Sequence, residues 1–154
     1  MNLTKMKQIP LTKGKFALVD DEDFEFLSQW KWHYIAGGYA CRKPKSGMIY
    51  MHRLLTRATE SHVDHKNGNK LDNRKENLRL CTVSQNLANQ VKTRGTSKYK
   101  GVRFDKKHKK WISAIGFNSR PIQIGRFASE DEAAKAYNLA AVKYYGEFAR
   151  LNQL

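Results

Sequence analysis

The chain has 154 residues, with 29 Lys and Arg against 14 Asp and Glu, and its net charge is +15. This length suits one ordinary domain or two small ones, and this charge attracts polyanions, so DNA or RNA is the expected partner and a membrane is not. No apolar run is long enough to span a bilayer and no exported leader is visible, from which we expect a cytoplasmic protein.

The first segment, from about residue 9 to residue 50, contains short β-like runs. Strands are predicted at residues 16–19, 30–34, 39–42 and 48–51. Gly37-Gly38 and Ser46-Gly47 are predicted hairpin turns between them. Cys41 and Cys81 have no paired metal-ligand spacing, so we expect both to be reduced and partly buried, without zinc.

An acidic run, residues 20–23, precedes Phe24, Phe26 and Leu27. Carboxylates in the first turn of a helix stabilise the helix dipole, so the run predicts the start of a short helix. A metal-binding role is the alternative. We favour the helix start, because it requires no ligand geometry and the run lies about forty residues before the acid-histidine pair described below.

The apolar stretch of residues 51–55 looks helical and contains His52. We expect this helix to pack under the hairpin that follows it. Two roles for His52 stay open: a buried histidine whose hydrogen bonds are satisfied, which we favour, and a catalytic histidine.

The stretch from Asp64-His65 to Asn86 contains the side chains that most clearly indicate a catalytic site. Hydrolysis of a phosphodiester requires a divalent ion to neutralise charge and a base to activate water, and this pair can supply both. Since neighbouring strand residues point to opposite faces, a bulge or irregular turn must lie beside them, and Asn67-Gly68 supplies a turn. Residues 78–83 predict the returning strand, and Ser84 predicts the N-cap of a short helix.

Over residues 49–89 the chain resembles the HNH endonucleases, in particular the asparagine-rich phage and intron-associated homing enzymes with a ββα-metal active site. The resemblance implies that Asp64 and Asn86 bind the metal, that His65 is the general base and that Asn77 orients His65. Asn86 is a neutral oxygen donor where many relatives have histidine, which favours Mg²⁺ or Mn²⁺ over zinc. If these residues formed only turns and helix caps, the histidine after an acid would have no explanation.

Residues 92–97 lose apolar side chains and predict a flexible basic linker. We therefore expect a nuclease domain at residues 1–91, with the ββα-metal motif at about 62–90, and a second domain at residues 98–154.

Three antiparallel strands are predicted in that second domain, at residues 99–104, 111–117 and 122–127. Ser129 and Glu132 form a capping box for a helix of residues 133–144, and Gly146 can end the helix. Alanines let this helix lie close to the sheet, with Trp111, Phe117 and Phe127 filling the gap. One face of the sheet is then free.

The segment closely resembles an AP2/ERF domain through residues 99–103, 124–127, 132–137 and 149–152. The whole chain is thus predicted to be α+β: a β-rich N-terminal region with the HNH motif, then an AP2-like three-stranded sheet packed on one helix. Plant members carry Glu, Arg and Trp where this chain has Ala114, Gly116 and Gln123, so we transfer no plant recognition sequence.

Nine Lys or Arg and one acid lie between Lys98 and Arg126, and a small antiparallel sheet can enter the major groove of DNA. We expect Arg103 to reach a base edge and the turn lysines to bind phosphates. The predicted DNA-binding set is Lys100, Arg103, Lys107, Lys110, Arg120 and Gln123.

These features predict a site-preferring HNH homing endonuclease that binds double-stranded DNA as a monomer and nicks one strand with Mg²⁺ or Mn²⁺. The resemblance implies a phage or mobile-element origin, and hence the host cytoplasm. A non-enzymatic DNA-binding regulator with a degenerate HNH domain is the alternative. An RNA-binding or ribosome-associated protein would fit the charge but not the metal constellation.

Overall fold

The computed structural model describes residues 6–91 and 95–154. The chain divides into two compact units, Met1–Cys81 and Thr82–Leu154. The predicted functional division, with a linker at residues 92–97, stays a prediction, and residues 92–94 lie outside the described residues. In the described part of the chain, no helix has the length and apolar character needed to cross a membrane.

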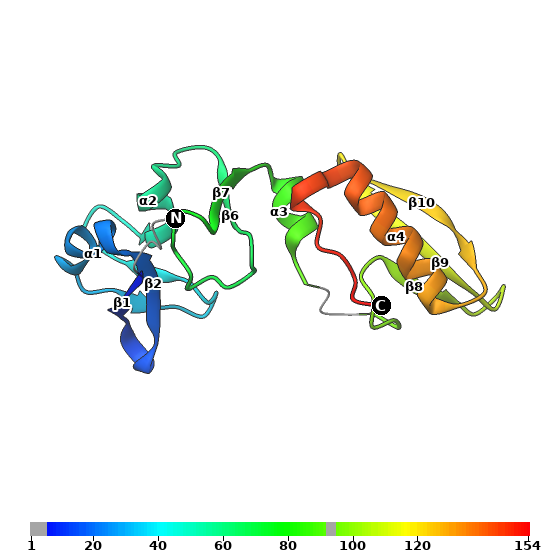
Figure 1. Ribbon diagram of the computed structural model, residues 1–154, viewed down its shortest axis with the longest axis horizontal. Helices are drawn as coiled ribbons and strands as arrows, with labels where there is room; N and C mark the ends of the chain where they lie inside the picture. The colour runs from blue at the N-terminus through cyan, green and yellow to red at the C-terminus, as the bar shows by residue number, and fades with distance from the viewer. Residues whose placement is uncertain (1–5, 92–94) are drawn as a thin grey trace. The chain divides into compact units, whose positions relative to one another are not determined.

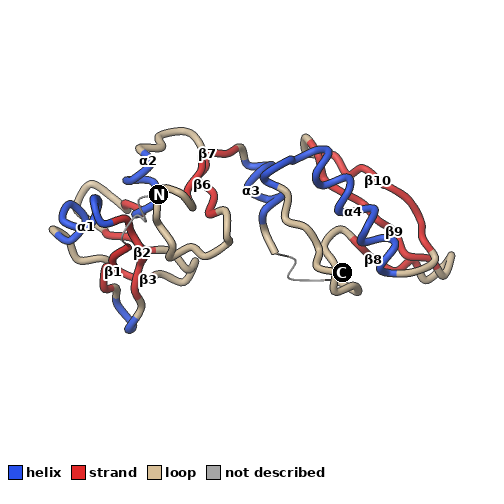
Figure 2. The backbone as a smooth tube through the Cα atoms, viewed as in Figure 1, coloured by secondary structure: helices blue, strands red, loops and turns tan. Residues whose placement is uncertain are grey.

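The first unit is built from small antiparallel sheets joined by short helices (Figure 2). Its strands are β1 (Met6–Pro10) paired with β2 (Phe16–Asp20), β3 (His33–Tyr34), β4 (Ala40–Arg42) and β5 (Ile49–Tyr50) in one sheet, and β6 (His62–His65) paired with β7 (Leu78–Cys81). Its helices are η1 (Thr12–Gly14), α1 (Asp21–Ser28) and α2 (Met51–Thr56).

Most predicted elements of this unit are present, with shifted ends. The run at residues 30–34 is reduced to β3, because Trp32 makes an isolated bridge with Leu11 and its indole donates to the Leu27 carbonyl. Met51 begins α2 and does not extend β5. The core gathers side chains from most of these elements: Ile9, Leu11, Ala17, Val19, Leu27, Trp32, Ala40 and Met51.

The acidic run does start a helix, as predicted. Asp21, Glu22 and Asp23 occupy the first turn of α1. Asp21 pairs with Lys7 at 2.6 Å, and Lys75 Nζ lies 2.5 Å from Glu22 and 3.3 Å from Asp23. These ion pairs connect the N-terminal hairpin and α1 to the loop between β6 and β7.

The second unit places a helix across a three-stranded antiparallel sheet (Figure 1). The strands run in the order β10-β9-β8, and α4 packs on one face of them. Its elements are α3 (Val83–Asn89), β8 (Val102–Asp105), β9 (Lys110–Phe117), β10 (Arg120–Phe127), α4 (Glu130–Tyr145) and η2 (Gly146–Phe148). The Ser129–Glu132 capping box and the Gly146 cap of α4 are confirmed.

The N-cap predicted for α3 was wrong by two residues. Thr82, and not Ser84, caps the helix, because its hydroxyl accepts from Gln85 N while the Gln85 side chain accepts from Thr82 N. Ser84 lies inside the helix, and its hydroxyl is 2.9 Å from the Tyr145 hydroxyl. This bond attaches α3 to the end of α4.

Candidate active site

The predicted acid and base lie at the end of β6 in a regular hairpin. Asp64 is opposite Arg79 and His65 is opposite Leu78, with no register shift between these pairs. The expected bulge is therefore absent from the paired residues, but the expected turn follows at once, since Gly68 has a φ of +77° and its N–H donates to the His65 carbonyl. Strand alternation directs Asp64 and His65 to opposite faces.

Asp64 is a buried carboxylate, 4% exposed, that faces a cation across the hairpin. Arg79 Nε donates to Asp64 Oδ2 at 2.9 Å, and Arg79 Nη2 lies 2.8 Å from the same oxygen. A buried carboxylate requires such a partner, because transferring a lone charge out of water is costly. Arg79 supplies that partner through both contacts with Asp64 Oδ2.

His65 is held on the other face by an amide and by aromatic rings. Burial lowers its pKa, whereas hydrogen bonding with the Asn73 side chain and the charge of Asp64 raise it in part. The His65 ring is 5.2 Å from the His52 ring in an edge-to-face arrangement, and 6.0 Å from the Tyr39 ring. With burial as the largest effect, the net shift of the His65 pKa is downward, which favours the uncharged imidazole, the form that accepts a proton.

His52 is buried, as expected, but its hydrogen bonding is not satisfied. It is 8% exposed, and its Nδ1 has no hydrogen-bond partner in the described part of the chain. Its ring packs against Tyr39 and Tyr50 at 5.0 and 5.5 Å. Burial, followed by the neighbouring His65, lowers the His52 pKa to about 3. His52 is thus a neutral ring that packs against the predicted base.

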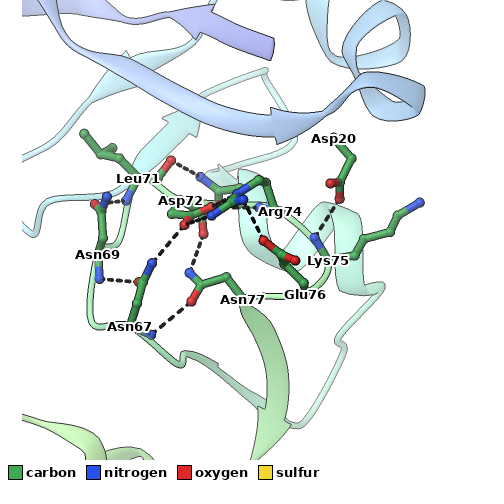
Figure 3. A network of polar contacts seen from close by, with 10 residues as sticks. Asp20, Asn67, Asn69, Leu71, Asp72, Arg74, Lys75, Glu76 and Asn77 are labelled. Carbon is green, nitrogen blue, oxygen red and sulfur yellow. Dashed lines mark hydrogen bonds and ion pairs between the residues drawn. The ribbon is translucent and has the colours of Figure 1, made fainter. Parts of the chain in front are cut away.

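Asn77 braces the loop that follows His65. Its Oδ1 accepts from Asn67 N at 3.0 Å, and its Nδ2 donates to the Asp72 carbonyl at 2.7 Å (Figure 3). These bonds join both ends of the loop. The amide that interacts with His65 belongs to Asn73, which the sequence analysis did not single out.

Asp72 is the centre of this loop's polar network (Figure 3). Its side chain is 2% exposed and accepts from Asn67 Nδ2 and from both Nε and Nη2 of Arg74, each at 2.8 Å. Hydrogen bonding with Arg74 lowers the Asp72 pKa. Leu18 N donates to the Leu71 carbonyl and Asn73 N donates to the Leu18 carbonyl, so β2 holds the loop in place.

The donor set suits a hard divalent ion with few protein ligands. The described residues contain no group of three or more His, Cys, Asp or Glu that could enclose a metal. Mg²⁺ typically binds through one or two carboxylates together with water and substrate phosphate, so the Asp64 carboxylate fits such an ion. Asn86 is half-buried on α3, which belongs to the second unit, and its role as a ligand stays a prediction.

The face of the sheet opposite α4 carries part of the predicted DNA-binding set. Val102 and Ser113 are register partners, and both lie on the α4 side of the sheet. Neighbouring strand residues point to opposite faces. Arg103 and Arg126, which both pair with Ile112, therefore share the other face with it. Arg103 and Arg126 are exposed. By the same alternation Lys110 and Gln123 lie on this face, and Arg126 is a cation that the sequence analysis did not include.

The other predicted contacts lie elsewhere. Lys107 is exposed in the β8–β9 turn, where Asp105 accepts from its backbone N–H. Arg120 pairs with Phe117 and therefore lies on the α4 side of the sheet. Lys100 Nζ donates to the carbonyls of Leu87 at 3.1 Å, Ala88 at 2.5 Å and Gln90 at 2.7 Å. These bonds occupy the ammonium at the end of α3.

Comparison with known proteins gives two kinds of similarity. Residues 59–88 match the family described as HNH endonuclease. An uncharacterized HNH endonuclease of Acanthamoeba polyphaga mimivirus is 33% identical over 149 residues, an alignment that covers 92% of this chain and 77% of the viral protein.

Shorter matches are to plant proteins. The AP2-like ethylene-responsive transcription factor PLT2 of Arabidopsis thaliana is 39% identical over 56 residues, which cover 35% of this chain and 10% of that factor. The ethylene-responsive transcription factor WRI1 of the same plant is 37% identical over 62 residues, or 39% of this chain and 14% of that factor. The chain thus spans only a small part of these factors.

Proposed function

Because the chain belongs to the HNH endonuclease family, we propose that it is a homing-type endonuclease that binds duplex DNA and hydrolyses one phosphodiester with Mg²⁺ or Mn²⁺. The observation that carries this proposal is the pair of adjacent, buried side chains at the end of β6, Asp64 paired with Arg79 and His65 with a pKa that burial lowers, inside the family-matched residues 59–88. A solely structural hairpin has no need for either group.

The chemistry of the proposal assigns separate tasks to these residues. His65 takes a proton from the attacking water, and its neutral form is ready to do so at neutral pH. The His52 ring packs edge-to-face against the imidazole, and hydrogen bonding with the Asn73 side chain raises the His65 pKa in part. Asp64, with Asn86 as the proposed second ligand, would hold the divalent ion, which would supply positive charge to stabilise the charge that develops during hydrolysis.

The second unit supports DNA binding. The short matches to plant transcription factors, together with the exposed Arg103 and Arg126 on the face opposite α4, favour a sheet that contacts the duplex. We place Arg103, Lys110 and Gln123 at the groove and Lys107 at a phosphate. A monomer with one such hairpin would cut one strand.

Incubation of the protein with supercoiled plasmid separates this proposal from a DNA-binding regulator with an inactive hairpin. We expect Mg²⁺ or Mn²⁺ to convert the plasmid to the open-circular form, and EDTA or His65→Ala to prevent the conversion. Gel-shift measurements on the same samples report binding. Retarded DNA without any strand cleavage in either ion would favour the regulator.

A further inference from the structure

Arg79 is a largely buried cation beside the proposed metal ligand. It lies on β7 directly opposite Asp64, and its side chain is 11% exposed while that of Asp64 is 5% exposed. Nε and Nη2 both contact Asp64 Oδ2. Two nitrogens of the guanidinium therefore lie close to the Asp64 carboxylate.

This geometry has a consequence for the binding of a cation. Asp64 and Arg79 together carry no net charge, so a divalent ion that approaches Asp64 is attracted by the carboxylate and repelled by the guanidinium at a similar distance. The repulsion is weakly screened because Asp64 is buried and most of the Arg79 side chain is shielded from water. An anionic phosphate next to the pair would offset the arginine charge and restore the attraction.

We propose that Arg79 couples metal binding to DNA binding, so that the ion is held weakly by the free protein and firmly only when a backbone phosphate lies at the hairpin. This role rests on the proposed function. It makes Arg79 a positioning residue: it orients Asp64 through Oδ2 and sets the affinity of Asp64 for the ion. The advantage is that the base and the metal come together only on substrate.

Mn²⁺ titrations followed by electron paramagnetic resonance test the coupling without any reliance on cleavage. The full chain carrying His65→Ala is titrated with MnCl₂ alone and with a short random-sequence duplex. We expect the duplex to raise Mn²⁺ affinity on the order of tenfold or more. Equal Mn²⁺ affinity with and without the duplex would overturn the proposal, and this measurement requires no change at Arg79.

A second set of variants identifies Arg79 as the origin of the coupling, since a phosphate can also ligate the ion directly. Arg79→Gln keeps a donor for Asp64 but removes the charge, so Mn²⁺ should bind the DNA-free protein on the order of tenfold more tightly, and the effect of the duplex should shrink by a similar factor. Arg79→Lys keeps the charge and should stay near the parent. Unchanged or weaker Mn²⁺ binding by DNA-free Arg79→Gln would overturn the proposal.

Arg57→Gln is the matched control, because it removes one exposed positive charge from the same unit. Its Mn²⁺ affinity should equal that of the parent with and without the duplex. A cleavage assay on the chain with His65 intact separates the two proposals. If this chain cleaves DNA with Mg²⁺ while Arg79→Gln leaves Mn²⁺ binding unaltered, only the coupling is overturned. Absence of both cleavage and Mn²⁺ binding overturns the proposed function as well.

Discussion

Two asparagines near His65 have different contacts, and their replacement should have different effects. Asn73 interacts with the imidazole, whereas Asn77 binds Asn67 N and the Asp72 carbonyl. We expect Asn73→Ala to lower the cleavage rate more than the stability, and Asn77→Ala to lower the free energy of unfolding by about 1–3 kcal/mol through its lost buried bonds. Urea unfolding and single-turnover cleavage of both variants check this. A folded Asn77→Ala as inactive as His65→Ala would give Asn77 a direct role.

His65 itself should be indispensable if it is the base. His65→Ala should fold and bind DNA but cleave on the order of a hundredfold more slowly, because water is then deprotonated without a positioned base. Single-turnover rates at saturating Mg²⁺ measure the loss. Wild-type rates in the variant would remove His65 from the mechanism.

His52 should make the stability of the protein sensitive to acid. Burial lowers its pKa to about 3 in the folded state from the ordinary 6.5, so between these pH values the unfolded chain binds a proton that the native state does not. The neutral, buried His52 therefore contributes fully to the free energy of unfolding above pH 6.5. As the pH falls from 6.5 toward 3, this free energy decreases by up to about 1.4 kcal/mol per pH unit.

Unfolding of wild type and His52→Phe at pH 7 and pH 5 measures this contribution. Phe keeps a ring against His65 but cannot take up a proton, so its stability should fall by about 2 kcal/mol less than that of wild type over this interval. His33→Gln, at an exposed histidine, should follow the wild type. Identical pH dependence in His52→Phe would mean that His52 is protonated equally in both states.

At the scale of elements, α4 packs tightly against Gly101, the residue before β8. A Cβ there would lie 2.0 Å from Tyr137 Cδ2 and 2.6 Å from the Ala114 carbonyl oxygen, and φ is +74°. Gly101→Ala should therefore cost about 2–4 kcal/mol of unfolding free energy, because both the ring and the strand must move. Gly116→Ala, with nothing within 4 Å of the added methyl, should change stability by less than about 1 kcal/mol. Equal costs would contradict the packing.

Lys100 stabilises the fold of the second unit in addition to adding to its positive charge. Its ammonium contacts the last carbonyls of α3, and burial, with Arg150 nearby, lowers its pKa to about 8. Lys100→Met should lower the unfolding free energy by about 1–2 kcal/mol, because these carbonyls lose a charged donor. Lys106→Met, at an exposed turn, should not. A stable Lys100→Met protein with weaker DNA binding would instead place Lys100 at a phosphate.

The sequence predicted elements better than contacts, for physical reasons visible at single residues. The acidic start of α1 and the Ser129–Glu132 capping box are local signals, and both are confirmed. The Asp64–Arg79 pair depends on hairpin register, which a long irregular loop between β6 and β7 does not fix. The ring contact between His52 and His65 joins α2 to β6, so only the folded chain shows it.

At the scale of the whole molecule, a net charge of +15 predicts DNA binding that weakens steeply with salt. Much of the basic excess lies in the sheet of the second unit and its turns, where nine Lys or Arg accompany one acid between Lys98 and Arg126. We therefore expect this unit to supply most of the affinity for DNA. Replacing a charged residue on the sheet face opposite α4 should weaken DNA binding more than replacing Arg57.

Arg103 and Lys107 should differ in the kind of contact they make. Arg103 is exposed on the face opposite α4, in a row with Ile112 and Arg126, so its planar donors can reach a base edge when the sheet enters the groove. Lys107 lies in the turn between β8 and β9, where Asp105 accepts hydrogen bonds from the backbone N–H groups of Lys107 and His108. At this end of the sheet we expect Lys107 to contact a phosphate and not a base.

Binding selections on randomised duplexes, with salt titrations of each variant, test this difference. Arg103→Ala should lose about 1–3 kcal/mol of binding free energy and relax preference at one or two base pairs, whereas Lys107→Ala should weaken all sequences alike and reduce the salt slope by about one. Lys107→Ala is thus the matched control for Arg103→Ala, since each removes one exposed charge from the same β8–β9 hairpin. If Arg103→Ala kept the wild-type sequence profile and changed only the salt slope, Arg103 would bind a phosphate and the bases would be read by other residues of that face.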